Sequence, residues 1–231
     1  MTRAGAQRVN DGPEDDLLLT IIHDIRVHLR RSITRAQMLE RQSDSSLAPE
    51  LQKHLDEILA SGREMDVLLS RLAKYAVAGT EAKEKPPGPV AVMFDSALRR
   101  LAARNVDAQI DSQRYRSASV QVPYSFETVV YELLDNALKF RQGPVKITLL
   151  VEQALEKSVF GVKDTGIGFE PRFYERIMRP LERLHSTSVY PGCGLGLAIC
   201  QRTIEAWGGT IWAESKLGGG STFWFSLPAP R

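Results

Sequence analysis

Two runs of helical hydrophobic periodicity occupy the first third of the chain. Apolar or small residues recur at alternating steps of four and three, which is the heptad pattern of helices that pack along their length. A polar break from Ser43 to Ser46 separates the runs, so the sequence predicts two long helices in an antiparallel hairpin. The heptad residues are Leu18, Ile22, Ile25, Leu29, Ser32, Ala36 and Leu39 in the first run, and Leu51, Leu55, Ile58, Gly62, Met65, Leu69, Leu72 and Ala76 in the second.

A single hairpin of this kind leaves one side of each heptad seam exposed to water. Pairing two hairpins into a four-helix bundle buries that side, so the pattern favours a homodimer. Gly79 and the run from Lys85 to Pro89 are typical of a helix end followed by a linker. The expected organisation is a flexible N-terminus at 1–15, the helical hairpin at 16–80, a linker at 81–90 and a second domain at 91–231.

Beyond the linker the hydrophobic period changes repeatedly between that of helices and that of strands. This alternation predicts an α+β chain whose second domain is an α/β sandwich, with helices on one face of a mixed or antiparallel sheet. The expected helices are 94–104, 125–140 and 194–207, and the expected strands are 108–110, 119–122, 146–151, 158–162, 210–214 and 221–227.

Composition excludes several classes of function. The chain has 231 residues and a net charge of +2, which is too small to indicate nucleic acid as a partner. The run Leu17–Ile22 is too short to span a bilayer, and Met1–Pro13 lacks the apolar core of a signal peptide. Cys193 and Cys200 lack metal-ligand spacing. These features favour a cytoplasmic protein without direct membrane insertion.

One helix of the second domain carries residues suited to magnesium and phosphate. The amide oxygen of Asn136 can bind Mg²⁺, and Glu132, one turn earlier on the same face, can hold or polarise a water or act as a second ligand. Lys139 can reach a phosphate, and Phe140 can cover a base. Taken alone, this segment is typical of any polar helix end.

Two glycine-rich segments follow in the order that a nucleotide site needs. Asp164 can accept a hydrogen bond from an exocyclic amino group, while Gly166 and Gly168 let the backbone approach a planar base. Further along, glycines open a helix whose N–H groups and dipole favour phosphate. Each segment alone is weak, but together with Arg183 and the Asn136 helix they indicate a magnesium–nucleotide site. The second segment comprises Gly192, Gly194, Leu195, Gly196 and Leu197.

These motifs resemble the catalytic core of sensor histidine kinases, over almost the whole chain. Glu132–Phe140 is similar to the family's N box, Asp164–Gly168 to its G1 box and Gly192–Leu197 to its G2 box, and Arg183–His185 ends a segment similar to the F box. The amino-acid sequence from Arg183 to Ser215 resembles that of phytochrome-type members. The resemblance implies a Bergerat-type ATP-binding domain behind a dimerising hairpin, with ATP and Mg²⁺ as cofactors and a response regulator receiver domain as partner.

The same resemblance points to the first helix for a phosphate acceptor, where Ile22-His23-Asp24 stands. His23 follows the seam residue Ile22, so we expect it on the flank of the bundle. Imidazole is a competent nucleophile near neutral pH, and Asp24 can accept the proton of the ring nitrogen that does not attack. Arg183 is a candidate for stabilising the transferring group. Without the downstream domain, His23 would be read as a solvent-facing histidine.

The sequence departs from the family pattern at several positions, which leaves alternatives open. His28 and Val27 replace a proline and a polar residue, and Val27 puts phosphatase activity in doubt. Met178 and Leu181 stand where aromatic residues are expected. Beside autophosphorylation on His23 with transfer to a response regulator aspartate, the chain can be read as a nucleotide-binding dimeric scaffold that signals by contact. A third reading is an ATPase that uses Glu132 to activate water.

Overall fold

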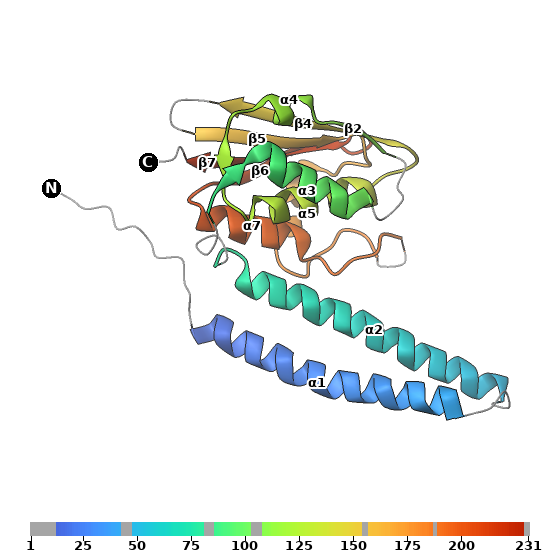
Figure 1. Cartoon of the computed structure of the whole chain (residues 1–231). Helices are drawn as coiled ribbons and strands as arrows, with labels where there is room; N and C mark the ends of the chain where they lie inside the picture. Colours follow the sequence, from blue (N-terminus) through green and yellow to red (C-terminus); the bar gives the residue numbers. More distant parts are fainter. Residues whose placement is uncertain are drawn as a thin grey trace. The chain divides into compact units, whose positions relative to one another are not determined.

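The computed structural model describes residues 13–42, 48–80, 86–102, 108–153, 157–186 and 189–228. The chain divides into two compact units, Met1–Val77 and Ala78–Arg231, and each is described by itself. The first is a helical hairpin, and the second combines helices with a sheet (Figure 1). The polar break at 43–46 lies outside the described residues, as does the part of the expected linker at 81–85. None of the helices in the described ranges is both long and apolar enough to cross a membrane.

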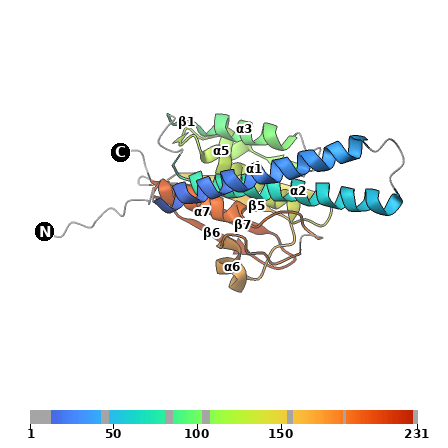
Figure 2. The same cartoon turned by 90° about the horizontal axis from the view of Figure 1, so that it is seen from below.

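The hairpin consists of α1 (Pro13–Gln42) and α2 (Pro49–Val77), which lie side by side in both views (Figures 1 and 2). Both helices begin at a proline, whose fixed φ and missing N–H suit the first turn. The helix therefore starts inside the segment that we expected to be flexible. At Gly62 the two helices approach closely, because a β-carbon there would lie 2.7 Å from Ile33 Cγ1.

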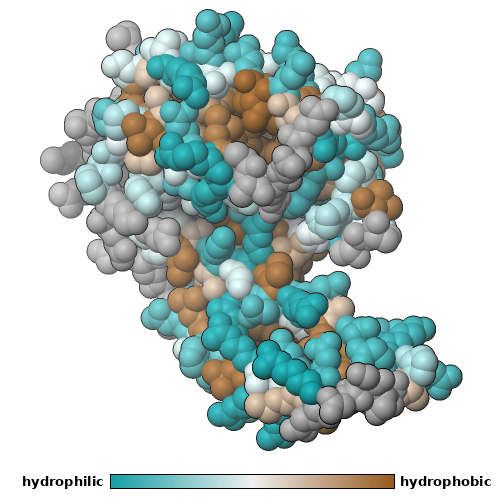
Figure 3. Space-filling view, turned by 45° about the vertical axis from the view of Figure 1, so that its right-hand side comes forward, coloured by the Kyte–Doolittle hydropathy of each residue, from teal (hydrophilic) through white to brown (hydrophobic). Residues whose placement is uncertain are grey.

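The heptad seam is split between the inside and the outside of the hairpin. A single neighbouring helix covers only a narrow strip of each helix, so one heptad position is covered while the other remains at the surface. Figure 3 shows hydrophobic residues among polar ones on the hairpin. The covered residues are Ile22, Ala36, Leu55, Gly62, Leu69 and Ala76, with Leu29 half-buried, whereas Ile25, Leu39, Leu51, Ile58 and Met65 are each about half exposed or more.

The second unit is built on a five-stranded mixed sheet. Its strand order is β2-β4-β5-β7-β6, with β2 parallel to β4 and every other pair antiparallel. The strands are β2 (Ala108–Asp111), β4 (Val145–Gln153), β5 (Lys157–Asp164), β6 (Ile211–Ser215) and β7 (Ser221–Pro228). A separate pair joins β1 (Gly88–Pro89), which falls in the expected linker, to β3 (Gln121–Val122). The α+β class predicted from the sequence is confirmed.

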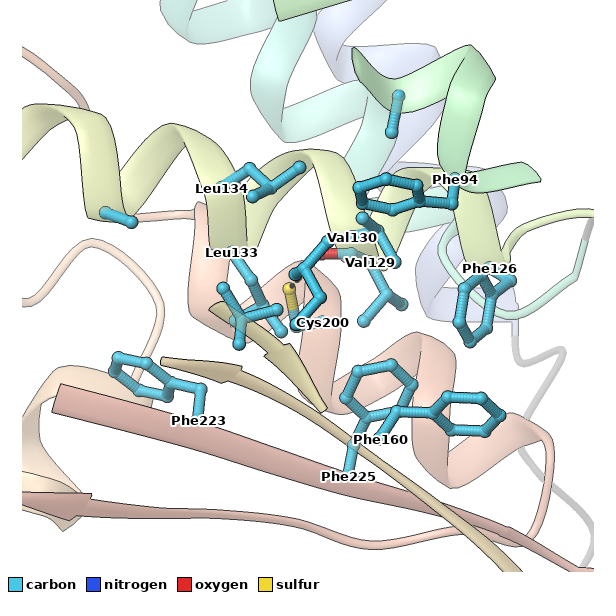
Figure 4. Close-up of a cluster of buried hydrophobic side chains, with 14 of the residues drawn as sticks. Phe94, Phe126, Val129, Val130, Leu133, Leu134, Phe160, Cys200, Phe223 and Phe225 are labelled. Atoms are coloured by element: carbon cyan, nitrogen blue, oxygen red, sulfur yellow. Dashed lines mark hydrogen bonds between the residues drawn. The ribbon is translucent and has the colours of Figure 1, made fainter. Parts of the chain in front are cut away.

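Helices cover one face of this sheet and form the core with it (Figure 1). Aromatic rings from α5, β5 and β7 meet at the centre, with centroids 5.0 Å apart for Phe126 and Phe160 and 5.3 Å for Phe160 and Phe225 (Figure 4). Cys200 is buried beside them and donates to the carbonyl oxygen of Val129 at 3.7 Å. The helical segments are α3 (Val90–Ala102), α4 (Gln113–Ser117), α5 (Phe126–Lys139), the 3₁₀ turn η2 (Pro171–Phe173), α6 (Tyr174–Met178) and α7 (Gly196–Ala206).

Two predicted helix starts differ from the structure: α3 begins at Val90 and not at Phe94, and α7 begins later than expected. Ser125 is the N-cap residue of α5, as expected, but its side chain forms no cap bond within the described residues, and its hydroxyl accepts a hydrogen bond from Trp207 Nε1 at 3.2 Å. The helix expected from Gly194 begins at Gly196, because Gly194 has a left-handed φ of 73° that an α-helix does not allow.

Tyr115 on α4 supplies a prediction about stability. Its ring is fully buried, 5.2 Å from that of Phe94 and 5.8 Å from that of Phe160, and its hydroxyl has no hydrogen-bond partner among the described residues. Burial raises the pKa of this hydroxyl above its ordinary value. We expect Tyr115→Phe to raise the free energy of unfolding by about 1–2 kcal/mol, because an unpaired buried polar group is removed. Urea unfolding measures this free energy, with Tyr124→Phe as a control at a partly exposed tyrosine. An unchanged or lower free energy of unfolding for Tyr115→Phe would contradict the expectation.

Candidate functional site

The C-terminal half of α5 faces the start of α7. Glu132 is only 2% exposed although it is a carboxylate. A β-carbon built on Gly196 would lie 2.9 Å from Glu132 Oε2 and 3.7 Å from Asn136 Oδ1. The structure therefore brings together Glu132, Asn136 and the first residue of α7, which the sequence analysis had assigned to separate motifs. A β-carbon at Gly196 would therefore lie too close to Glu132 Oε2, while it would only be in van der Waals contact with Asn136 Oδ1.

Lys139 is held at the glycine-rich loop by a buried carboxylate. Its Nζ lies 2.6 Å from Asp135 Oδ2, one turn earlier on α5, and Asp135 is fully buried. A β-carbon on Gly192 would lie 3.4 Å from the same Nζ. The ammonium group is thus fixed beside the loop rather than extended into solvent. Sequence reasoning overlooked Asp135, although an acid four residues before a lysine on a helix is a recognisable signal.

The glycine-rich loop leads into α7 through two left-handed residues. Gly192 has a φ of 146° and Gly194 one of 73°, and Gly194 accepts a hydrogen bond from the Leu181 N–H at 3.0 Å. Leu195 is fully buried and begins the helical bonding by accepting from the Ile199 N–H at 2.9 Å. Within the described part of the chain no side chain caps this helix end, so backbone N–H groups at its first turn face the loop.

Leu197, the last residue of the G2-like motif, has a different surrounding. It is half-buried and packs against the hydrophobic core of the second unit.

Asp164 closes β5 with a turn built for close backbone contact. Its Oδ1 accepts the Gly166 N–H at 2.7 Å. Burial raises the pKa of Asp164, while hydrogen bonds from the backbone of Gly166 and Ser221 oppose that rise. A β-carbon on Gly168, where φ is 61°, would lie 2.1 Å from the carbonyl oxygen of Lys216. These glycines are therefore required by the protein's own backbone, a role that the sequence argument did not give them.

Gly166 has the same requirement on the other side of the turn. A β-carbon there would lie 2.3 Å from the carbonyl oxygen of Phe140, and that oxygen also accepts the Ile167 N–H at 2.9 Å. The end of α5 and the Asp164 turn are consequently locked together through backbone atoms.

An aromatic cluster gathers beside the end of α5. The Phe140 ring centroid lies 5.2 Å from that of Tyr190 and 6.3 Å from that of His185, and His185 lies 5.2 Å from Tyr190. Arg183 Nη2 donates to the carbonyl oxygen of Tyr190. Phe140 thus packs on the segment that carries Arg183, and the participation of Tyr190 was not predicted. Aromatic residues so far apart in sequence give no signal of mutual contact.

Met178 and Leu181, which stand where aromatic residues were expected, differ in their exposure. Met178 is buried at 6% exposure, so this position lies in the interior although the residue is not aromatic. Leu181 is 53% exposed and has a φ of 67°, a left-handed conformation that a branched residue seldom adopts.

In the first unit, His23 lies at the surface of α1. Its Nδ1 is 3.3 Å from Asp24 Oδ1, and the two side chains are 75% and 71% exposed. With Nδ1 directed to Asp24, Nε2 is the ring nitrogen that does not face this carboxylate. His54 has a comparable arrangement on α2, since its Nδ1 lies 3.7 Å from Glu57 Oε2.

Comparison with known proteins places this geometry in a family. Residues 121–231 match the family described as "Histidine kinase-, DNA gyrase B-, and HSP90-like ATPase". Phytochrome-like protein Cph1 of Synechocystis is 32% identical over 89% of this chain and 28% of its own length. Adaptive-response sensory kinase SasA of Synechococcus is 30% identical, over 94% of this chain and 60% of its own. The chain thus spans less than two thirds of these relatives.

Solved structures agree with this assignment. Full-length ShkA in complex with AMPPNP has 25% sequence identity and a TM-score of 0.69, covering 93% of this chain and 46% of that one. The mycobacterial sensor histidine kinase MprB, at 22% identity and a TM-score of 0.50 over 62% of this chain, shares the fold. Residues 121–231 thus belong to the histidine kinase-, DNA gyrase B- and HSP90-like ATPases, with a Bergerat-type fold, and over most of its length the chain is similar to the catalytic core of sensor histidine kinases.

Proposed function

We propose that the chain uses ATP to phosphorylate itself on His23 and passes the phosphoryl group to an aspartate of a response regulator. The observation that carries this proposal is the meeting of Glu132, Asn136 and Lys139 at the glycine-rich start of α7. A neutral amide, a carboxylate and an ammonium group at a helix N-terminus suit a magnesium–triphosphate. The presence of AMPPNP in ShkA and the names of the relatives support it.

The residues present fit a hard cation. Asn136 Oδ1 and Glu132 Oε2 both lie against Gly196, and oxygen atoms of these types are the ligands that Mg²⁺ prefers. When bound, Mg²⁺ supplies neutralisation of phosphate charge. In the proposed site, Asn136 and Glu132 would hold the ion, and Lys139, fixed by Asp135, would neutralise charge on the phosphates beside Gly192.

The acceptor chemistry follows from the His23–Asp24 pair. Nε2 of His23 attacks the γ-phosphorus, a P–N bond forms, and the bond from that phosphorus to the β–γ bridging oxygen breaks to release ADP. The ring gains positive charge in this step. Asp24 accepts the Nδ1–H hydrogen bond, which keeps the tautomer that attacks and stabilises the charged ring.

The exposed half of the heptad seam supports a homodimer. Ile58 and Met65 on α2 and Ile25 on α1 are each about half exposed, although an isolated helix pair gains nothing by exposing them. In the proposed dimer a second hairpin covers them and completes a four-helix bundle.

The test is incubation with γ-labelled Mg·ATP, followed by treatment of the labelled protein with acid and with base. A label that acid removes and base leaves is expected of phosphohistidine. A label stable to acid would show that another residue is the acceptor and would overturn the proposal.

A second candidate function, a nucleotide-binding scaffold that signals by contact, is favoured by the state of Arg183. Its guanidinium is engaged with the carbonyl oxygen of Tyr190 in its own segment. Calorimetric binding of ATP without any phosphohistidine, at every magnesium concentration, would support the scaffold against the kinase.

The pKa of Asp164 gives a pH dependence to nucleotide affinity. Since burial raises that pKa, the carboxylate that would accept the adenine amino group is protonated at a higher pH than the usual value of about 4. We expect ATP affinity to fall as the pH drops through this raised pKa, and Asp164→Asn to abolish that dependence. Without nucleotide, the free energy of unfolding changes with pH in the opposite direction to ATP affinity. The folded state binds the proton more tightly than the unfolded state, so the protein gains stability as the pH falls. Titration calorimetry with ATP and scanning calorimetry without it, both across this pH range, measure the affinity and the stability. The variant Asp111→Asn, at an exposed aspartate, is the control. An unaltered pH profile in Asp164→Asn would refute the assignment of Asp164 as the acceptor of the adenine amino group.

A further inference from the structure

A polar contact joins the two helices of the hairpin close to His23. Arg26, three residues after His23, has a side chain that is only 24% exposed. Its Nε lies 3.3 Å from Asp66 Oδ1, and its Nη2 donates to Ser70 Oγ at 3.0 Å. Asp66 and Ser70 are one turn apart on α2, so a single guanidinium group contacts two successive turns of the facing helix.

Arg26 occupies a position where helix packing calls for an apolar residue. It lies one turn after the buried Ile22, on the face that α1 turns toward α2. The neighbouring heptad residue Ile25 is 49% exposed instead. An ion pair at such a contact adds little net stability over an apolar pair, and its best-attested effect is to fix the register of two helices.

Two contacts on one side chain make the register specific. A slide of α1 along α2 by one turn is a shift of about 5.4 Å, which would break the contacts of Arg26 with both Asp66 and Ser70. A rotation of α1 about its axis would carry the guanidinium away from α2 as well. The apolar residues around it, being small or flexible, tolerate such shifts better than a directed hydrogen bond does.

We propose that Arg26 is a positioning residue for the phosphorylation of His23, acting through Asp66 and Ser70. The inference rests on the proposed function. Successive residues of a helix are turned by about 100°, so holding Arg26 against α2 also fixes the direction in which the His23 ring leaves the hairpin. Phosphoryl transfer requires this direction to be constant, because a displacement of the nucleophile by about 1 Å can lower the rate about 100-fold.

The first test compares Arg26→Met with the charge-swapped double variant Arg26→Asp/Asp66→Arg, and uses Arg30→Met, at an exposed arginine one turn further on, as the matched control. We expect Arg26→Met to lower the rate of phosphohistidine formation at saturating Mg·ATP about tenfold or more while the KM for ATP changes less than about twofold. The double variant should recover most of the rate. Labelling of His23 by phosphoramidate, which needs only a reactive imidazole, should be unchanged.

Thermal unfolding separates positioning from simple support of the fold. The midpoint of Arg26→Met should fall, because the buried Asp66 Oδ1 is left without its cation. The midpoint of Arg26→Met/Asp66→Leu, which removes both charges, should stay the same or rise while the rate stays low. A rate within about twofold of wild type in Arg26→Met, or a loss of rate that follows a loss of thermal stability and is not recovered by the charge swap, would overturn the proposal.

A second measurement tests the register of α1 and α2 directly and does not depend on enzymatic activity. Spin labels at the exposed positions Arg31 and Ser61, in Cys193→Ser protein diluted with unlabelled chain, report the distance between α1 and α2. This distance should shift or broaden in Arg26→Met and return in the charge swap, and an unchanged distribution would refute the register role. Wild-type protein without phosphohistidine would refute the proposed function alone, because the spin-label distances still decide the role of Arg26.

Discussion

We expect replacement of His23 with glutamine to remove all phosphohistidine from protein incubated with γ-labelled Mg·ATP. Glutamine has nearly the length of histidine but carries no ring nitrogen with a nucleophilic lone pair, so no P–N bond can form. Because the His23 side chain is 75% exposed, the substitution should leave the free energy of unfolding within about 0.5 kcal/mol of wild type. Acid-labile label counted after electrophoresis, beside calorimetric titration with ATP, measures both consequences.

Two controls on the same hairpin make this result specific to one histidine. His28→Gln and His54→Gln should keep the label, although His54 also has a carboxylate, that of Glu57, near its Nδ1. Label that survives in His23→Gln would show that the acceptor lies elsewhere. A mixture of His23→Gln with Asn136→Ala then tests the proposed dimer, since label returning to the Asn136→Ala chain requires transfer between subunits.

The substitution Gly168→Ala should also have a large effect, because it should destabilise the fold of the second unit. A β-carbon there would lie 2.1 Å from the carbonyl oxygen of Lys216 and 2.8 Å from that of Gly220, and neither backbone atom can move without breaking the β6–β7 turn. The left-handed φ of 61° adds a further cost for any side chain. We expect a loss of about 4 kcal/mol or more in unfolding free energy, together with loss of ATP binding.

Gly143→Ala is the matched control for that experiment. Gly143 also has a left-handed conformation, with a φ of 87°, but nothing lies within 4 Å of a β-carbon built on it. It should lose only about 1–2 kcal/mol, which is the cost of the backbone conformation alone. If urea unfolding gave equal losses for the two variants, the steric account of the Asp164 turn would be wrong.

The sequence predicted those parts of the molecule that depend on local pattern. Helix α5, the hairpin strands β6 and β7 and the order of the nucleotide motifs follow from periodicity and glycine spacing. The short elements α4 and α6 were missed, because five-residue helices carry too little period to be recognised. The expected strand 119–122 contains β3, but its partner β1 was missed because Gly88 and Pro89 disfavour strands, and only tertiary contact with Gln121 and Val122 forms it.

The site was predictable in its residue types but less so in its geometry. Local sequence indicates Asn136 and Lys139, but the burial of Asp135 and the distance from Gly196 to Glu132 depend on how α7 packs on α5. The heptad pattern likewise treats its two apolar positions as equal. Which of them a neighbouring helix covers is decided by packing, and Arg26 shows that a polar residue can take part in that choice.

The division of the heptad seam into a buried and an exposed half has a consequence for which chains with similar hairpins can pair in one cell. Ile22 and Leu69 are buried, whereas Ile25 and Met65 remain at the surface of the hairpin. Under the proposed dimer, mutation at the second pair can change which chain is accepted as a partner while each hairpin still folds unaided. Duplicated genes could then diverge into insulated signalling lines by a few surface substitutions, without first passing through an unfolded ancestor.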